Sequence, residues 1–204
     1  KKKTGLPPCN PLLVAIVAVI LFLSVFRIEY GAYSRGADYL SYLLTPATVC
    51  LAIPLYRQLE LLRRQAAAVA AAILTGVAGS AASIYVMSLL FKLEHVYYVT
   101  LLPKSITTAI GMGVSEEAGG IVTLTVVSII VTGIFGNVTA DWLFFICRIE
   151  EPVAKGLALG TAAHATGTSR ALELGEAEGA MSSLAIAVAG LVTVAVVPLV
   201  SGLI

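Results

Sequence analysis

Residues 65–91 read QAAAVAAAILTGVAGSAASIYVMSLLF and contain no charged side chain. About 20 consecutive apolar residues are enough for a helix to cross the hydrocarbon core of a bilayer, so this stretch predicts a transmembrane helix. The whole chain has the same character, with 58% hydrophobic residues, 12% charged residues and a mean hydropathy of +0.95. Soluble domains are about 45–50% apolar and about 25% charged, which excludes a soluble enzyme.

Other long intervals without charge lie on both sides of this helix, at 4–26, 39–56, 118–140 and 179–204. Each is long enough, or nearly so, to span a bilayer. The last interval is rich in Ala, Val and Gly, and such small residues let membrane helices pack closely. We therefore predict an all-α polytopic membrane protein that crosses the inner (cytoplasmic) membrane of the cell several times.

Three segments carry residues that interrupt a helix. They are 39–56 with Pro46 and Pro54, 96–115 with Pro103, and 153–169 with Gly160 and Gly167. Proline removes an amide donor and clashes with the preceding turn, so a straight helix is disfavoured there. Non-helical backbone at membrane depth is tolerated only where it is buried in protein or lines a wet cavity. We therefore predict two discontinuous helices, in 39–56 and 153–169, that meet the broken segment 96–115.

Basic residues predict the topology, because cytoplasmic loops collect Lys and Arg. Basic clusters occur at Lys1–Lys3, at Arg57, Arg63 and Arg64, and at Arg148 and Lys155. All three clusters are cytoplasmic if 12–26, 40–56, 66–91 and 121–146 each cross once. Segment 96–115 must then be re-entrant and return to the outer side.

The order of segments predicts two pseudo-repeat units, about 11–91 and 119–204, joined by segment 96–115 in a single membrane domain, 1–204. Each unit has a straight segment, a broken segment and a long helix, and the topology makes the units inverted. Inverted repeats with paired broken helices are typical of secondary transporters, whose site lies at the bilayer midplane. Because the chain begins at Lys1 without Met, we expect an upstream segment to be absent from it.

Lys104 most directly indicates a functional site, because an ammonium at the bilayer centre costs about 2.5–3.5 kcal/mol to insert. It precedes Ser105, Thr107 and Thr108. These hydroxyls, with the free amides of a half-helix, can hold an anion such as a carboxylate. The alternative is that Lys104 extends to the membrane interface or pairs with Glu116.

Thr161, His164 and Thr168 are spaced so that a helix places them on one face. The imidazole can bind a substrate carboxylate or carry a proton, although a single membrane histidine can equally be an interhelical hydrogen-bonding group. Arg170 suits bidentate carboxylate recognition, and an interface anchor is the alternative.

Thr45 and Thr48 occupy the matching break in the first unit. They either face the second break or cap the carbonyls that Pro46 frees. Together with the residues above they complete the predicted substrate site.

Several classes of function are excluded or left without support. The 13 basic and 12 acidic residues give a net charge of +1, which does not suit a nucleic-acid-binding protein. The chain shows no hydrolase, zinc-protease or P-loop motif, and its three cysteines have no metal-ligand spacing. We therefore expect no enzymatic activity, metal or cofactor, apart from a coupling proton or sodium ion.

Four strings resemble the LrgB/CidB (YohK) family of membrane proteins: PPCNPLL, LLPKSITTAIGMGVSEEAGGI, TGIFGN and EEPVAKGLALGTAAHATGTSRALELGE. The resemblance covers essentially the whole chain. The family's characteristic positions fall on Pro103, Lys104, Ser105, Thr107, Thr108, Gly160, His164, Gly167, Thr168 and Arg170. Ala165-Thr166 departs from the family, in which a glycine and a small apolar residue are common. A hydrophobic helix normally precedes the position of Lys1.

The resemblance implies one of two functions. Bacterial members are antiholin-like or holin-like regulators of murein hydrolase activity and autolysis, and they act with a small LrgA/CidA-type membrane partner. Relatives are linked to pyruvate uptake, and a plastid relative carries glycolate and glycerate. We favour a secondary transporter for small monocarboxylates, because an oligomeric pore needs neither a buried lysine nor two broken helices. Transporter analogy alone suggests a homodimer.

Overall fold

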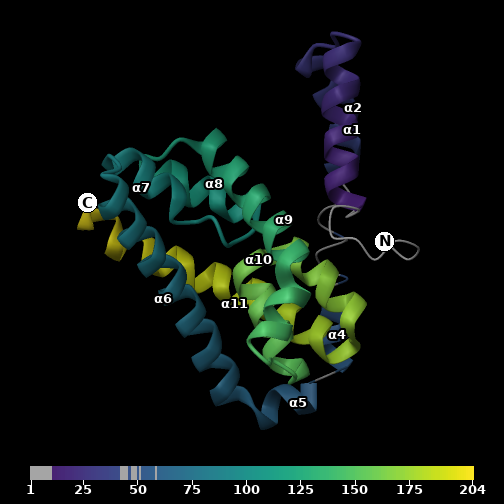
Figure 1. The fold of residues 1–204 in the computed structure, drawn as a ribbon, viewed down its shortest axis with the longest axis vertical. Coiled ribbons are helices and arrows are strands. Elements are labelled where there is room, and N and C mark those ends of the chain that lie inside the picture. Colours follow the sequence, from purple (N-terminus) through teal and green to yellow (C-terminus); the bar gives the residue numbers. More distant parts are fainter. Residues whose placement is uncertain (1–10, 42–45, 47–49, 51, 58) are drawn as a thin grey trace. The chain divides into compact units, whose positions relative to one another are not determined.

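The computed structural model describes residues 11–41, 46, 50, 52–57 and 59–204, and its regular elements there are helices (Figure 1). The helices are α1 (Pro11–Val25), α2 (Tyr30–Ser41), α4 (Ala52–Arg57), α5 (Leu59–Arg64), α6 (Ala66–Phe91), α7 (His95–Leu101), α8 (Thr108–Glu117), α9 (Val122–Ile146), α10 (Pro152–Leu174) and α11 (Glu176–Val200), with a 3-10 turn η2 (Ser201–Leu203). The prediction of an all-helical membrane chain is confirmed. Thr45, Thr48 and residues 42–44, 47, 49 and 51 of the predicted crossing 40–56 lie outside the described residues.

The chain divides into two compact units, Lys1–Ile53 and Pro54–Ile204. In the first unit, α1 and α2 face each other across an apolar groove. The groove is lined by Ala18, Val19, Phe22, Leu23, Ile28, Ala32 and Tyr33. The second unit contains the end of α4, the elements α5 to η2 and all the described residues of the predicted substrate site. The predicted pseudo-repeat units and single domain stay predictions.

Three helices of the described chain are long and apolar enough to cross a membrane: α6, α9, and α11 continued to Leu203. In α6 and α9 only 22% of the most apolar window is buried inside the protein. Large apolar side chains such as Leu90, Phe135 and Leu191 are therefore exposed. An exposed apolar surface of this extent is expected where lipid covers the protein.

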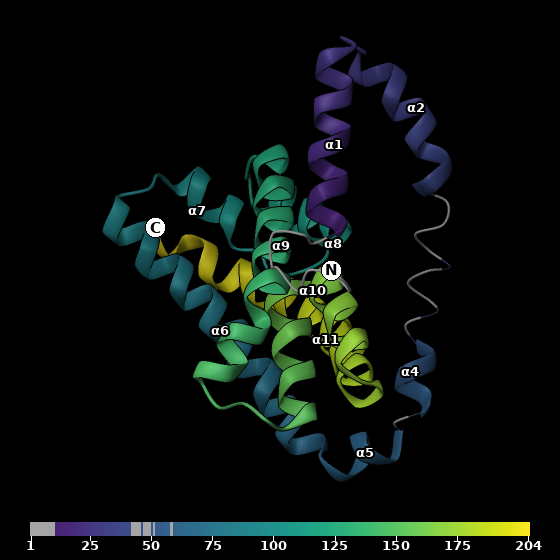
Figure 2. The same cartoon turned by 45° about the vertical axis from the view of Figure 1, so that its right-hand side comes forward.

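Helices α10 and α11 lie side by side and approach closely because glycines stand at their contact (Figure 2). A Cβ atom at Gly156 would collide with the carbonyl oxygen of Glu178, and one at Gly160 with the carbonyl oxygen of Ser182. Helix α6 packs on this pair through a cluster of small and branched side chains. The cluster includes Val69, Ile73, Val77, Val153, Leu157, Ala180, Met181 and Ala185.

Segment 96–115 forms α7 and α8, separated by a break at residues 102–107. The two ends of the segment lie together, since the Ile121 amide donates to Thr100 Oγ1 over 2.8 Å and Thr125 Oγ1 lies 2.6 Å from Ser115 Oγ. Helix α7 also lies beside the last residues of the chain, where the Tyr98 hydroxyl donates to the Val200 carbonyl oxygen over 2.9 Å (Figure 1). The break is therefore held between α6, α9 and α11.

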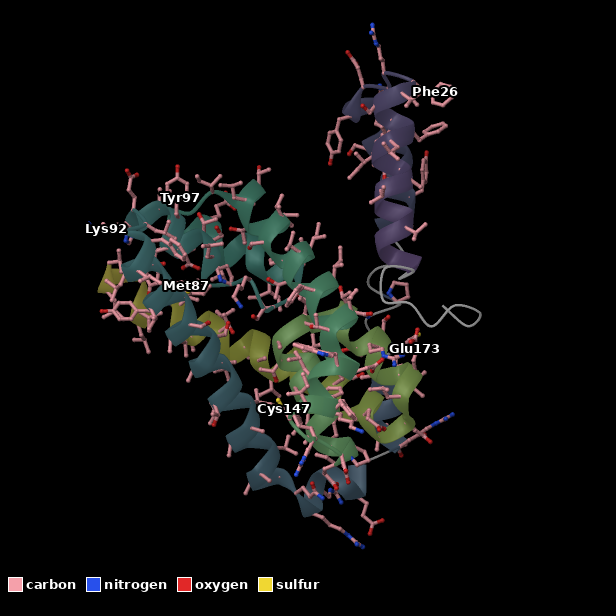
Figure 3. All side chains as sticks on the ribbon, in the orientation of Figure 1. Phe26, Met87, Lys92, Tyr97, Cys147 and Glu173 are labelled. Atoms are coloured by element: carbon pink, nitrogen blue, oxygen red, sulfur yellow. The ribbon has the colours of Figure 1, made fainter. Side chains whose placement is uncertain are left out.

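The same cap ends α1, α6 and α9. A basic residue follows each helix in the left-handed conformation, with φ of 50° at Arg27, 51° at Lys92 and 52° at Arg148. The next amide donates to the carbonyl five residues earlier, as in a Schellman motif. A glutamate comes next in each case, which gives the triplets Arg-Ile-Glu, Lys-Leu-Glu and Arg-Ile-Glu. Figure 3 shows Lys92 at the corner between α6 and α7, where an apolar helix ends in charged residues.

The Gly160→Ala substitution should destabilise the protein, because its methyl group meets the backbone of α11 and the two helices must move apart. We expect a cost of about 1–3 kcal/mol, as for other overpacked cores. Thermal unfolding of the purified protein in detergent measures it. Gly79→Ala is the matched control, since nothing lies within 4 Å of a Cβ there, and it should keep or raise the unfolding temperature. Equal unfolding temperatures for the two variants would contradict the packing described.

Candidate functional site

The break between α7 and α8 is built of two tight turns. The Lys104 amide donates to the Leu101 carbonyl over 3.1 Å, and the Ile106 amide donates to the Pro103 carbonyl over 3.3 Å. Pro103 is fully buried and cannot continue α7, because it has no amide proton to donate. Thr107 is extended, with φ −66° and ψ 149°, and is the N-cap of α8. These turns place Lys104 and Ser105 between the two short helices.

Lys104 is half-buried, and hydroxyl groups are its partners. Its Nζ donates to Ser105 Oγ over 3.2 Å and to Ser80 Oγ of α6 over 3.5 Å, while the two hydroxyl oxygens are 3.1 Å apart. In the part of the chain that the structure describes, no carboxylate lies within ion-pair distance of Lys104. Glu116, the alternative partner from the sequence, is exposed at the end of α8. A lysine in an apolar setting without a counter-ion is a candidate site for an anion.

These serines line a small cavity, here called the hydroxyl pocket. Its lining is Val77, Ser80 and Ala81 of α6, Leu102, Ser105 and Ile106 of the break, Thr161 of α10, and Thr193, Val196 and Val197 of α11. The cavity volume is about 10 Å³, which is close to the least that holds one water molecule. Residues of segments 96–115 and 153–169 both line the hydroxyl pocket, which is too closed here for a carboxylic acid.

Thr161 of α10 lines the hydroxyl pocket and lies two residues before the break in that helix. It is 8% exposed, and its Oγ1 has no hydrogen-bond partner in the described structure. Its methyl group packs on Gly76 of α6, where a Cβ atom would lie 2.6 Å from Thr161 Cγ2. Buried hydroxyl groups are almost always paired, so an unpaired one facing a cavity calls for a missing partner such as water or a ligand oxygen.

The break in α10 lies at Ala163 and His164, not at the glycines singled out in the sequence. Ala163 has φ −127° and ψ 15°, and His164 has φ 42° and ψ −137°, a conformation that side chains disfavour. Gly160 and Gly167 remain helical and serve close approach. A Cβ at Gly160 would strike the Ser182 carbonyl, and one at Gly167 would strike the Leu159 carbonyl.

His164 faces α9 instead of the hydroxyl pocket. It is 5% exposed, and its Nε2 lies 3.0 Å from the Ile129 carbonyl oxygen. Since a carbonyl oxygen only accepts, Nε2 carries the proton in this contact. Gly133 makes room for the ring, because a Cβ atom there would lie 2.7 Å from Nε2. The geometry fits the alternative role of an interhelical hydrogen-bonding group.

Side chains donate to two backbone carbonyl groups beside the break in α10. The Asn137 side-chain amide of α9 donates to the Thr166 carbonyl over 2.7 Å, and Thr168 Oγ1 donates to the His164 carbonyl over 3.1 Å. Thr168 Oγ1 also lies 2.7 Å from Ser182 Oγ of α11. The broken backbone is thus sealed by α9 and α11, as a break away from water requires.

Arg170 is paired within the protein. It forms a fork on Asp141 of α9, with nitrogen–oxygen distances of 3.2 and 2.6 Å, and a contact of 2.6 Å with Glu173. Its guanidinium therefore ties α10 to α9 and does not line the hydroxyl pocket.

The remaining predicted residues complete the comparison. Thr107 and Thr108 are half-buried at the start of α8 and do not line the pocket. Ser80 and Thr193 line the pocket but were not predicted, because single hydroxyls on long apolar helices show no distinctive pattern. Asn137 was visible only as part of the string TGIFGN. In the described residues no cluster of side chains suits a metal ion.

The sequence of the chain is similar to that of known proteins. Residues 1–203 match the LrgB-like family. The chain is 37% identical to "Holin-like protein CidB" of Staphylococcus aureus (strain Mu50 / ATCC 700699) over 94% of its length and 84% of that relative. It is 38% identical to "Antiholin-like protein LrgB" of Bacillus mycoides (strain KBAB4) over 93% of its length and 83% of that relative. No solved structure matches the chain.

Two isosteric substitutions should change stability in opposite directions. Thr161→Val removes a buried hydroxyl that has no partner and should raise stability by about 0.5–1 kcal/mol. Thr168→Val removes a bonded hydroxyl, leaves Ser182 without that contact, and should lower stability by about 1–3 kcal/mol. Thermal unfolding in detergent distinguishes them, and each variant is the control for the other. A loss of stability in Thr161→Val equal to that in Thr168→Val would show that the Thr161 hydroxyl is bonded.

Proposed function

The chain belongs to the LrgB-like family, and from this and from its hydroxyl pocket we propose that it is a secondary transporter for small monocarboxylates such as pyruvate or glycolate. The observation that carries the proposal is that two broken segments line one pocket, and that its serines contact a half-buried lysine that lacks a carboxylate partner in the described residues. Such breaks and charges near the middle of a membrane protein are typical of transport sites.

The pocket has the donors that one carboxylate needs. The Lys104 ammonium supplies the compensating charge, and the hydroxyls of Ser80, Ser105, Thr161 and Thr193 can donate to two oxygen atoms. Val77, Leu102 and Val197 form an apolar wall suited to a short carbon chain. A single cation favours a substrate with a single negative charge.

The pocket must open for transport to occur. Its volume of about 10 Å³ accommodates one water molecule, whereas even the smallest of these acids has several heavy atoms. This form of the protein is therefore the closed state of a carrier, in which the helices around the pocket have come together. A binding site that is closed to both sides is a necessary stage of alternating access.

We extend the proposal to the topology. The contact between Ile121 and Thr100 brings the start of α9 to α7, which favours a re-entrant path for segment 96–115. Lys155 and Arg148 then share the cytoplasmic side with Arg57. Inverted repeats, a homodimer, a small LrgA/CidA-type partner and the inner membrane of the cell belong to the same proposal.

The second candidate is a holin-like or antiholin-like regulator that acts through an oligomeric pore on murein hydrolase export and autolysis. The names of the relatives favour it, and the exposed apolar faces of α6 and α9 provide surface for helix association. It gives no role to Lys104 or to the unpaired Thr161 hydroxyl. Leakage of a large neutral dye from liposomes that contain the protein would support the pore.

Lys104→Met should lower the uptake of labelled pyruvate or glycolate into proteoliposomes about tenfold or more, because a charge-assisted contact to the carboxylate is lost. The matched control is Lys92→Met, which removes the same charge at the exposed corner between α6 and α7 and should leave uptake unchanged. Both variants are compared with wild type at equal reconstituted amounts. Normal uptake by Lys104→Met, or no uptake by folded wild-type protein under any gradient, would contradict the proposal.

A further inference from the structure

We propose that Lys104 is the coupling group of this carrier: it takes up a proton together with the substrate carboxylate and releases it when the pocket empties, so that transport is symport of one proton with one monocarboxylate. The inference rests on the proposed function and assigns its driving force. It starts from the partners of Lys104, which are Ser80 and Ser105.

Hydroxyl partners suit both protonation states of the amine. A serine hydroxyl accepts a hydrogen bond from an ammonium and can turn to donate one to a neutral amine. The hydrogen bond between Ser80 and Ser105, over 3.1 Å, can change its direction with the proton. A carboxylate in their place would only accept and would keep the lysine charged. The serines therefore permit a lysine that gains and loses its proton.

The other charged and titratable groups of the surrounding helices are engaged elsewhere or lie at helix ends. On α7 and α8, Tyr98 donates to Val200, His95 lies against Ile204, and Glu116 and Glu117 are exposed. On α10, His164 contacts Ile129, and Arg170 contacts Asp141 and Glu173. Lys155 of the same helix lies over the Phe144 ring. On α11, Glu176 pairs with Arg57, and Glu178 lies beside Gly175. On α6, Tyr85 packs on Tyr98 and Lys92 caps the helix. Within the described chain, none of these groups forms an ion pair with Lys104.

Charge balance then sets the order of events. An empty pocket with a charged lysine and no counter-ion is costly away from water, so the lysine of the empty carrier is neutral. Binding a carboxylate anion and a proton gives an ammonium–carboxylate pair with no net charge. On the other side of the membrane the acid anion leaves and the amine returns the proton to water. The empty and the loaded carrier are both neutral at the pocket, which lets both rearrange.

The first measurement uses the wild-type chain. Adding pyruvate to the purified protein in weakly buffered detergent solution should take up about one proton per bound substrate, followed with a pH indicator dye. In proteoliposomes, a one-unit pH gradient, acid outside, should accumulate pyruvate about tenfold, with or without a sodium gradient. Uptake that follows sodium and ignores pH would overturn the inference while leaving the proposed function intact. No uptake at all would overturn both.

Lys104→Arg separates binding from coupling. Arginine keeps its positive charge at all accessible pH values, so the loaded carrier stays neutral at the pocket while the empty carrier keeps an unpaired charge. We expect exchange of external labelled pyruvate for internal unlabelled pyruvate to persist, while accumulation driven by the pH gradient falls about tenfold or more. Lys104→Met should lose both activities. Accumulation by Lys104→Arg at the wild-type level would overturn the inference.

Folding of each variant is checked by its elution as a single species and by its unfolding temperature. If Lys104→Arg does not fold, the proton count on the wild-type protein decides alone. A count of zero protons per bound pyruvate then overturns the inference, and a count of about one supports it.

Discussion

The fold of the second unit depends on one constraint: a break in a membrane helix must have its backbone groups bonded inside the protein. At membrane depth an unbonded backbone carbonyl beside the break at Ala163 and His164 would cost several kcal/mol. Asn137 donates to the Thr166 carbonyl and Thr168 Oγ1 donates to the His164 carbonyl. This sealing requires α9 and α11 to lie within hydrogen-bond distance of α10, and glycines at both contacts make that approach possible.

Much of the helical layout could be predicted from the sequence, because charged residues mark where apolar helices end. Segment 66–91 is α6, 121–146 is α9 within one residue, and the predicted broken segment 153–169 lies within α10. Three helices, α1, α6 and α9, end at a triplet of a basic residue, an aliphatic residue and a glutamate, at 27–29, 92–94 and 148–150. These triplets could have predicted the three helix ends directly. Local chemistry suffices for helix ends, since a Schellman cap needs only neighbouring residues.

The site was harder to predict, because its geometry comes from contacts between distant helices. Ser105 and Thr161 line one pocket, and Lys104 contacts Ser105 beside it. The rarity of charge in an apolar chain is what identified Lys104. The position of the break in α10 was not predictable from its glycines. Gly160 serves close packing on α11, whereas the non-helical His164 contacts Ile129 of α9. Ser80 became visible only through its neighbours in space.

Packing also decides how a carrier built this way can open. Helices α10 and α11 meet backbone against side chain at Gly156 and Gly160, so separating them would expose polar groups and empty a close-packed contact. The pocket, in contrast, is walled by side chains that meet across a small cavity, and α6 reaches α10 there through Thr161 and Gly76. Separation along this second surface breaks few hydrogen bonds and hydrates Lys104. In the proposed carrier, opening along the surface between the pair α10–α11 and α6 is therefore less costly than separating α10 from α11.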